Sequence, residues 1–282
     1  MPPTWHTTQG GPVKEEQANT SETVAHFYDQ YGWVRQTTGA QGEDQLFRSF
    51  PKAQAKYSER HFERICRLFG AERQTLLFAG CGDMPDGHMR IAQLFQNVTC
   101  MDISTTALDI AQAKLGRGAS YVRESIVNTT LPDNLFDTVY CAHVLFHINK
   151  DEQETAVRQL LRVTKPGGRL LIAYANPNSP FAIPGESVRR VKGWLGYGRQ
   201  SSDAMPALYY FAHHLHWWQR FADDCKLSLV PSDIIGSRPA RTMLRTERMA
   251  SIFYDWADRI ETRAPRVAVR LWQYVIAILE KA

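Results

Sequence analysis

Short apolar runs recur along the middle of the chain, and the segments between them carry apolar residues at helical spacing. The runs predict buried strands, and the spaced residues predict amphipathic helices that cover them. Repeated alternation with short links predicts an α/β fold with a doubly wound, parallel sheet. Strands are expected at 75–79, 98–101, 121–122, 136–141, 169–174, 227–235 and 274–280, although a helix from Arg266 would fit the last segment nearly as well.

Helices are expected before the first strand and between the strands. Ser21 is a suitable N-cap for an aromatic helix that Gly32 ends, and Ser104 is a suitable N-cap for another helix. Asn149 or Asp151 opens a further helix, which Lys165-Pro166-Gly167-Gly168 ends. The other helices are expected at 54–69, 88–95, 213–224 and 249–260.

Composition narrows the class of protein. The chain has 282 residues, of which 44% are hydrophobic and 22% charged, as in ordinary globular proteins. A formal net charge of +4 is too small to indicate a nucleic-acid partner. The five cysteines are scattered without a Cys-x-x-Cys pair, which indicates reduced, buried thiols in a cytoplasmic protein. No apolar run approaches the roughly 18 residues needed to cross a bilayer, so no membrane insertion is expected.

One stretch carries a chemical signal. The apolar run 76–79 ends in Gly80-Cys81-Gly82, and a second apolar run ends in Asp102 twenty residues later. Strand, glycine turn, helix, strand and acid are the layout of a nucleotide site in which the acid binds ribose hydroxyls. An NAD-dependent oxidoreductase would share this layout, but the third glycine of the dinucleotide motif is replaced by Met84-Pro85.

Four segments together resemble the class I S-adenosylmethionine-dependent methyltransferases of the small-molecule type. They are the glycine motif 77–82, the segment 101–104 around Asp102, the stretch 131–148 and the segment 161–170 with Lys165-Pro166-Gly167-Gly168. The resemblance covers roughly residues 75–175. It implies a Rossmann-like seven-stranded sheet, mostly parallel with one antiparallel strand, and S-adenosylmethionine as the cofactor. The cofactor-binding residues that it implies are Ala79, Gly80, Cys81, Gly82, Asp102, Ile103, Ser125, Ile126 and His143.

Two positions depart from the family's pattern. Phe78 replaces the acid that commonly begins the glycine motif, which removes a hold on the amino group of the cofactor. Met84 replaces the last glycine, which suggests a slightly wider turn.

The family resemblance also organises the rest of the chain. Residues 1–20 are polar and are expected to form a flexible tail. Residues 21–282 are expected to form a single methyltransferase domain. Its expected parts are an N-terminal helical lid (21–70), the cofactor-binding core (75–175), a cap insertion (176–212) and the remaining core and C-terminal elements (213–282).

Histidines are the candidates for acid–base chemistry, because imidazole exchanges protons near neutral pH. His143 is expected in the pocket wall as a base, whereas His147 is either a second catalytic residue or a packing residue of the next turn. The acceptor pocket is expected to include Tyr28, Tyr31, His213 and Trp217. No metal site is expected, because the spacing of His213, His214 and His216 points them to different sides of a helix.

The expected function is methyl transfer to an oxygen, rather than a nitrogen or carbon, of a small organic acceptor such as a secondary metabolite, glycoside or lipid precursor. The alternatives are a non-methylating relative that binds the same cofactor and an NAD-dependent oxidoreductase. The partner expected is the small-molecule acceptor rather than nucleic acid, and a homodimer stays open.

Overall fold

The computed structural model describes residues 23–29, 50–181, 208–236, 240 and 243–282. Three expected features lie outside these described residues: the tail at 1–20, Tyr31 and residues 182–207 of the cap.

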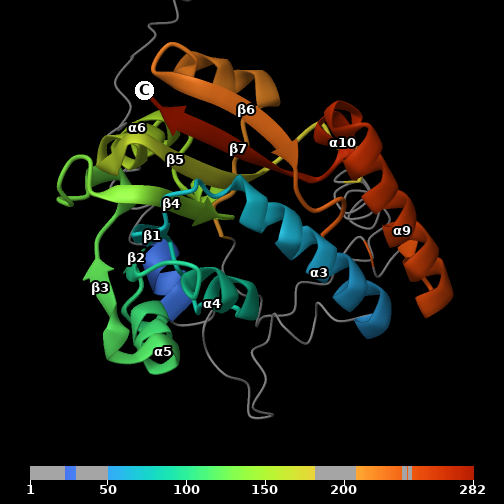
Figure 1. The fold of residues 1–282 in the computed structure, drawn as a ribbon, viewed down its shortest axis with the longest axis horizontal. Helices are drawn as coiled ribbons and strands as arrows, with labels where there is room; N and C mark the ends of the chain where they lie inside the picture. Colours follow the sequence, from blue (N-terminus) through green and yellow to red (C-terminus); the bar gives the residue numbers. More distant parts are fainter. Residues whose placement is uncertain (1–22, 30–49, 182–207, 237–239, 241–242) are drawn as a thin grey trace, which may run out of the picture.

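A seven-stranded sheet forms the centre of the molecule, with strand order β3-β2-β1-β4-β5-β7-β6 (Figure 1). The first five strands are parallel, whereas β7 is antiparallel to both of its neighbours. The expected sheet, mostly parallel with one antiparallel strand, is therefore confirmed. The strands are β1 (Thr75–Ala79), β2 (Asn97–Asp102), β3 (Ala119–Arg123), β4 (Phe136–Ala142), β5 (Thr164–Ala175), β6 (Cys225–Pro231) and β7 (Tyr274–Lys281).

Helices cover both faces of this sheet, which explains why its central strands are apolar on both sides. Leu77 of β1 faces a core under α6 and a 3₁₀ helix, Leu215–Phe221. The neighbouring Leu76 and Phe78 face the opposite core, under α3, α4 and α5. The helices are α3 (Pro51–Leu68), α4 (Asp86–Ala92), α5 (Thr105–Leu115), α6 (Gln153–Val163), α9 (Glu247–Arg263) and α10 (Pro265–Leu271).

A third apolar cluster joins α3 to α9 and α10, which lie beside one another in Figure 1. The rings of Tyr57 and Tyr254 stack with centroids 4.9 Å apart. The buried carboxylate of Glu261 accepts hydrogen bonds from the Tyr57 hydroxyl and the Trp272 indole, each at 2.6 Å, and pairs with Arg64. Helices from the N-terminal and C-terminal parts of the described chain are thus held together.

Several expected boundaries are wrong. The sixth strand ends at Pro231 rather than at residue 235, because its partner β7 begins at Tyr274, one residue before the Pro231–Val275 pair. The helix expected at 213–224 is the shorter 3₁₀ helix Leu215–Phe221. The last segment contains both alternatives, since α10 precedes the strand β7. Helix α6 begins at Gln153, and the residues 165–168 belong to β5.

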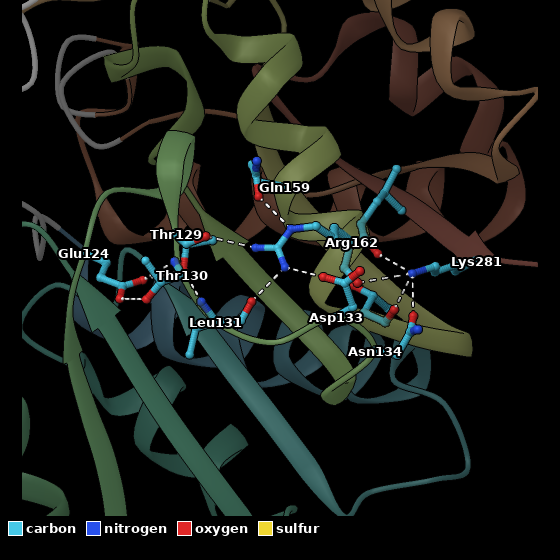
Figure 2. Close-up of polar contacts among 11 residues, drawn as sticks. Glu124, Thr129, Thr130, Leu131, Asp133, Asn134, Gln159, Arg162 and Lys281 are labelled. Carbon is cyan, nitrogen blue, oxygen red and sulfur yellow. Dashed lines mark hydrogen bonds and ion pairs between the residues drawn. The ribbon is translucent and has the colours of Figure 1, made fainter.

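The loop 129–135, which leads into β4, is held by two cations (Figure 2). Arg162 donates to the carbonyls of Thr129 and Leu131, at 2.9 and 2.8 Å. The Lys281 ammonium donates to the carbonyls of Leu161 and Arg162 at the end of α6, at 2.9 and 3.2 Å. Lys281 therefore satisfies helix-end carbonyls that have no partner within the helix.

Among the helices of the described residues, none has the length and apolar character that crossing a membrane requires.

Candidate functional site

The strand order reverses between β1 and β4. The chain moves outward from β1 to β2 and β3, and then returns to the other side of β1 with β4 and β5. Ligands of open parallel sheets bind at the carboxyl ends of the strands where the order reverses. The turn after Ala79, Asp102 at the end of β2 and His143 after β4 therefore lie at the same edge of the sheet.

The turn after β1 is tight and left-handed. Gly80 and Gly82 have φ angles of 71° and 56°, which glycine adopts without steric cost. The amides of Gly80 and Cys81 both donate to the Met101 carbonyl, at 2.8 and 3.0 Å, so β2 holds the turn. A Cβ atom at Gly80 would lie 2.4 Å from the Val144 side chain. Packing against Val144 is thus a reason for glycine at position 80 that the sequence did not indicate.

Met84 adopts the backbone conformation of the glycine that it replaces. Its φ angle is 52°, and its side chain is fully buried, with the sulfur 4.0 Å from that of Cys100. The substitution therefore keeps the left-handed backbone and does not by itself require a wider turn.

Asp102 is anchored by the backbone on either side of it. One carboxylate oxygen accepts from the Gly82 amide and the other from the Ser104 amide, both at 2.9 Å. Burial raises the pKa of Asp102, the backbone amides oppose this shift, and the carboxylate of Asp29 adds to it. A carboxylate has about four lone-pair positions, so the two that remain can accept from a pair of ligand hydroxyls.

A short N-terminal helix, residues 23–29, extends across this edge of the sheet. At one end, Asp29 accepts from the Ser104 hydroxyl at 2.5 Å and from the Thr106 amide at 3.3 Å. The ring of Tyr28 lies 6.3 Å from that of His147 in an edge-to-face arrangement. The helix therefore connects the start of α5 with the segment after β4, as a lid over the site would.

His143 follows β4 in a strained conformation. Its φ angle is 62°, its amide donates to the Ala173 carbonyl at 3.0 Å, and its ring packs edge-to-face on Tyr274. Desolvation by the neighbouring elements lowers the pKa of His143, although the residue keeps part of its surface exposed, and the carboxylate of Asp233 opposes this shift. The imidazole is therefore neutral at pH 7 and can accept a proton.

His147 packs against the segment that follows the undescribed part of the chain. Its Nδ1 atom lies 2.8 Å from the Tyr209 carbonyl, so this nitrogen carries the proton. Its ring contacts those of Phe146 and Tyr210. These contacts agree with the packing role of His147, and its catalytic role stays a prediction.

His213 and Trp217 line a different cavity. Their rings stack at 4.6 Å, and together with residues of α6 and its approach they line a cavity of about 400 Å³. Neither Asp102 nor the glycine turn lines this cavity. The part of the chain that the structure describes contains no group of three or more potential metal ligands.

The loop after β3 has mainly structural contacts. The Ser125 hydroxyl accepts from the Val127 amide at 3.3 Å, and Ile126 is buried in the core. Glu124, the acid nearest to this position, accepts from the Thr129 hydroxyl and the Thr130 amide, at 2.6 and 2.8 Å (Figure 2). Ile103 is half-buried, directly after Asp102.

Two residues at this edge were missed in the sequence. Asp29 has no motif around it, and only the packing of its helix onto α5 reveals its place. His88 of α4 stacks on Phe78 with ring centroids 5.2 Å apart and meets Tyr140 edge-to-face. The sequence signal for His88 is its place among the apolar residues of a helix that packs on the core.

Comparisons with known proteins give a consistent result. Residues 77–172 match the sequence profile of the family described as "Methyltransferase domain". The ubiquinone/menaquinone biosynthesis C-methyltransferase UbiE of Pseudomonas paraeruginosa is 35% identical over 107 residues, which are 36% of this chain and 41% of that protein. The UbiE protein of Citrobacter koseri is 34% identical over 102 residues, 34% of this chain and 39% of that protein. The chain thus spans less than half the length of these relatives.

Solved structures share the fold. A SAM-dependent methyltransferase from Archaeoglobus fulgidus superposes with a TM-score of 0.51 at 13% identity, covering 81% of this chain and 94% of that one. The geranyl diphosphate C-methyltransferase of Streptomyces coelicolor A3(2) superposes with a TM-score of 0.52 at 17% identity, covering 94% and 98%. At these identities the likeness concerns the fold alone.

Proposed function

We propose that this chain is a class I S-adenosylmethionine-dependent methyltransferase that transfers the methyl group of S-adenosylmethionine to a small organic acceptor, because residues 77–172 match a methyltransferase domain. The observation that carries this proposal is the anchored Asp102 carboxylate beside the left-handed glycine turn. An NAD-dependent oxidoreductase is not supported, because the matched region 77–172 is a methyltransferase domain.

The residues at the carboxyl edge suit such a cofactor. Asp102 would accept from both ribose hydroxyls, the backbone of Gly80 to Gly82 would lie along the methionine part, and Ile103 would contact the adenine. When bound, the sulfonium supplies an electrophilic methyl group that an acceptor displaces in line. The short helix with Tyr28 and Asp29 would exclude water from this edge.

The acceptor atom is proposed to be carbon rather than the oxygen expected from the sequence, because the matched relatives are named C-methyltransferases. In either case the methyl group replaces one hydrogen, and a proton must leave the acceptor. Neutral His143 would accept that proton at an unprotonated ring nitrogen.

Titration calorimetry with S-adenosylmethionine tests the proposal. Asp102→Ala removes the acceptor for two hydroxyls, and we expect the affinity to fall by about tenfold or more, since hydrogen bonds to charged groups contribute about 1.5–3 kcal/mol. Asp109→Ala, on the exposed side of α5, is the matched control and should bind like the wild type. Equal affinities of the Asp102→Ala and wild-type proteins would contradict the proposal.

Incubation with S-adenosylmethionine and an extract of small molecules separates a methyltransferase from a non-methylating relative. We expect S-adenosylhomocysteine together with a product that has gained one methyl group in place of one hydrogen. Nuclear magnetic resonance of that product identifies a carbon or an oxygen as the methylated atom.

A further inference from the structure

A buried polar atom beside the glycine turn lacks a partner. Nδ1 of His88 is shielded from solvent and has no hydrogen-bond partner among the residues that the structure describes. Buried polar atoms are nearly always paired in native proteins, and an unpaired one calls for an explanation such as a missing ligand.

The position of His88 relates this atom to the proposed cofactor site. The ring of His88 lies near the backbone of Cys81, the middle residue of the glycine turn, and this backbone favours the protonated ring. On its other side the ring meets Tyr140, which pairs with Phe78 across β1 and β4. His88 therefore lies beside the turn, over the ends of β1 and β4, whereas Asp102 lies on the β2 side of β1.

The protonation of the ring determines what Nδ1 can do. Burial lowers the pKa of His88 to about 4, so the ring is neutral at pH 7. A neutral imidazole carries one proton, and with that proton on Nε2 the unpartnered Nδ1 is an acceptor. Nδ1 then has a free lone pair and can only accept a hydrogen bond.

A cofactor held at Asp102 by its ribose would have its methionine part beside the glycine turn, whose backbone leaves room for it. That end carries an α-ammonium group, which only donates hydrogen bonds. Position 78 cannot accept from it, because Phe78 offers an aromatic ring that is covered by His88. We propose that Nδ1 of His88 accepts a hydrogen bond from the α-ammonium group of bound S-adenosylmethionine, an inference that rests on the proposed function.

Nitrogen-15 resonance of labelled histidines in the wild-type protein tests this contact without a substitution. S-Adenosylhomocysteine contains the α-ammonium group, whereas 5′-methylthioadenosine lacks the whole amino-acid end. We expect the Nδ1 resonance of His88 to shift on binding of S-adenosylhomocysteine and to stay in place on binding of 5′-methylthioadenosine. A resonance that responds equally to both ligands, or to neither, overturns the inference.

Calorimetry of two variants measures the strength of the contact. His88→Phe keeps a ring over Phe78 but removes the acceptor, and it should lower the affinity for S-adenosylhomocysteine about tenfold while leaving that for 5′-methylthioadenosine within about twofold. His88→Asn keeps an acceptor near the position of Nδ1 and should restore much of the loss. His216→Phe, at an exposed histidine away from the turn, is the matched control.

The outcomes separate the two proposals. If His88→Phe weakens both ligands equally, the residue only packs the turn and the inference is wrong. If His88→Phe binds S-adenosylhomocysteine as tightly as the wild type, the inference is also wrong, although the proposed function stands. If the wild type binds neither adenosyl ligand, the proposed function itself fails.

Discussion

At the scale of single residues, Met84 and His143 show how the site tolerates backbone strain. Among the described residues other than glycine, Met84, Asn134 and His143 have positive φ angles, and Met84 and His143 follow β1 and β4 at the carboxyl edge of the sheet. A left-handed conformation costs about 1–2 kcal/mol. Full burial of the Met84 side chain contributes roughly 1.5–3 kcal/mol, so burial outweighs the strain and a methionine can occupy a glycine position.

His143 has no comparable burial of its side chain to offset its strain, which is typical of a residue kept for function. We expect His143→Asn to lower turnover by about 10²–10⁴-fold, the usual contribution of a general base, because the amide cannot accept the proton. Asparagine tolerates a positive φ angle, so the backbone should persist. Single-turnover kinetics and cofactor calorimetry check this together, and unchanged turnover would remove His143 from the mechanism.

At the scale of elements, the N-terminal helix and α5 are joined at one point. Ser104 caps α5 by accepting from the Ala107 amide at 3.1 Å, and its hydroxyl donates to Asp29. The sequence correctly indicates the cap, because capping depends on local spacing. The contact with Asp29 joins residues 75 positions apart, so no local pattern could reveal it.

Asp29 also lies near Asp102, so it affects the pH dependence of cofactor binding. Ionised Asp102 is needed to bind ribose hydroxyls, and its raised pKa means that cofactor affinity should fall on acidification above the usual carboxyl range. Asp29→Asn removes a like charge, lowers the pKa of Asp102 and should shift this loss of affinity to lower pH. Affinity measured from about pH 4 to 7 checks the shift, with exposed Asp109→Asn as the control. Identical profiles for all three proteins would contradict it.

At the scale of the whole molecule, the cluster of α3, α9 and α10 joins a helix that precedes the sheet's first strand to two helices that precede its last strand. Glu261 is at its centre, with its side chain fully buried against Tyr57, Trp272 and Arg64. Removing the Glu261 carboxylate leaves the buried Tyr57 hydroxyl and Trp272 indole without this acceptor, whereas Arg64 keeps its ion pair with Asp258.

Glu261→Ala should therefore lower the free energy of unfolding by about 2 kcal/mol or more, since an unsatisfied buried donor costs about 1–3 kcal/mol. Thr262→Ala, on the exposed side of the same helix, should change it by less than about 0.5 kcal/mol. Urea denaturation of both variants measures the difference. If Glu261→Ala were as stable as Thr262→Ala, the cluster would not hold the helices together.

The pattern of apolar runs was sufficient for the strands of the parallel core, because each is a short buried segment with a turn at either end. The pattern did not predict the boundary of a strand where pairing with a distant strand sets that boundary. The end of β6 depends on where β7 begins, and the chain reaches that strand more than forty residues later. The last segment was consistent with both an α-helix and a strand, because its strand partners, β5 and β6, are distant in the chain.

The sequence by itself determined the fold class, the glycine turn, the acid at the end of β2 and the cap of α5, since these depend on neighbouring residues. The tertiary structure alone decided that Val144 requires glycine at position 80, that Asp29 reaches Ser104 and that His88 covers Phe78. It also placed His213 and Trp217 in a cavity apart from Asp102. Such contacts form between residues far apart in the chain, and only the packing of helices on a sheet brings them together.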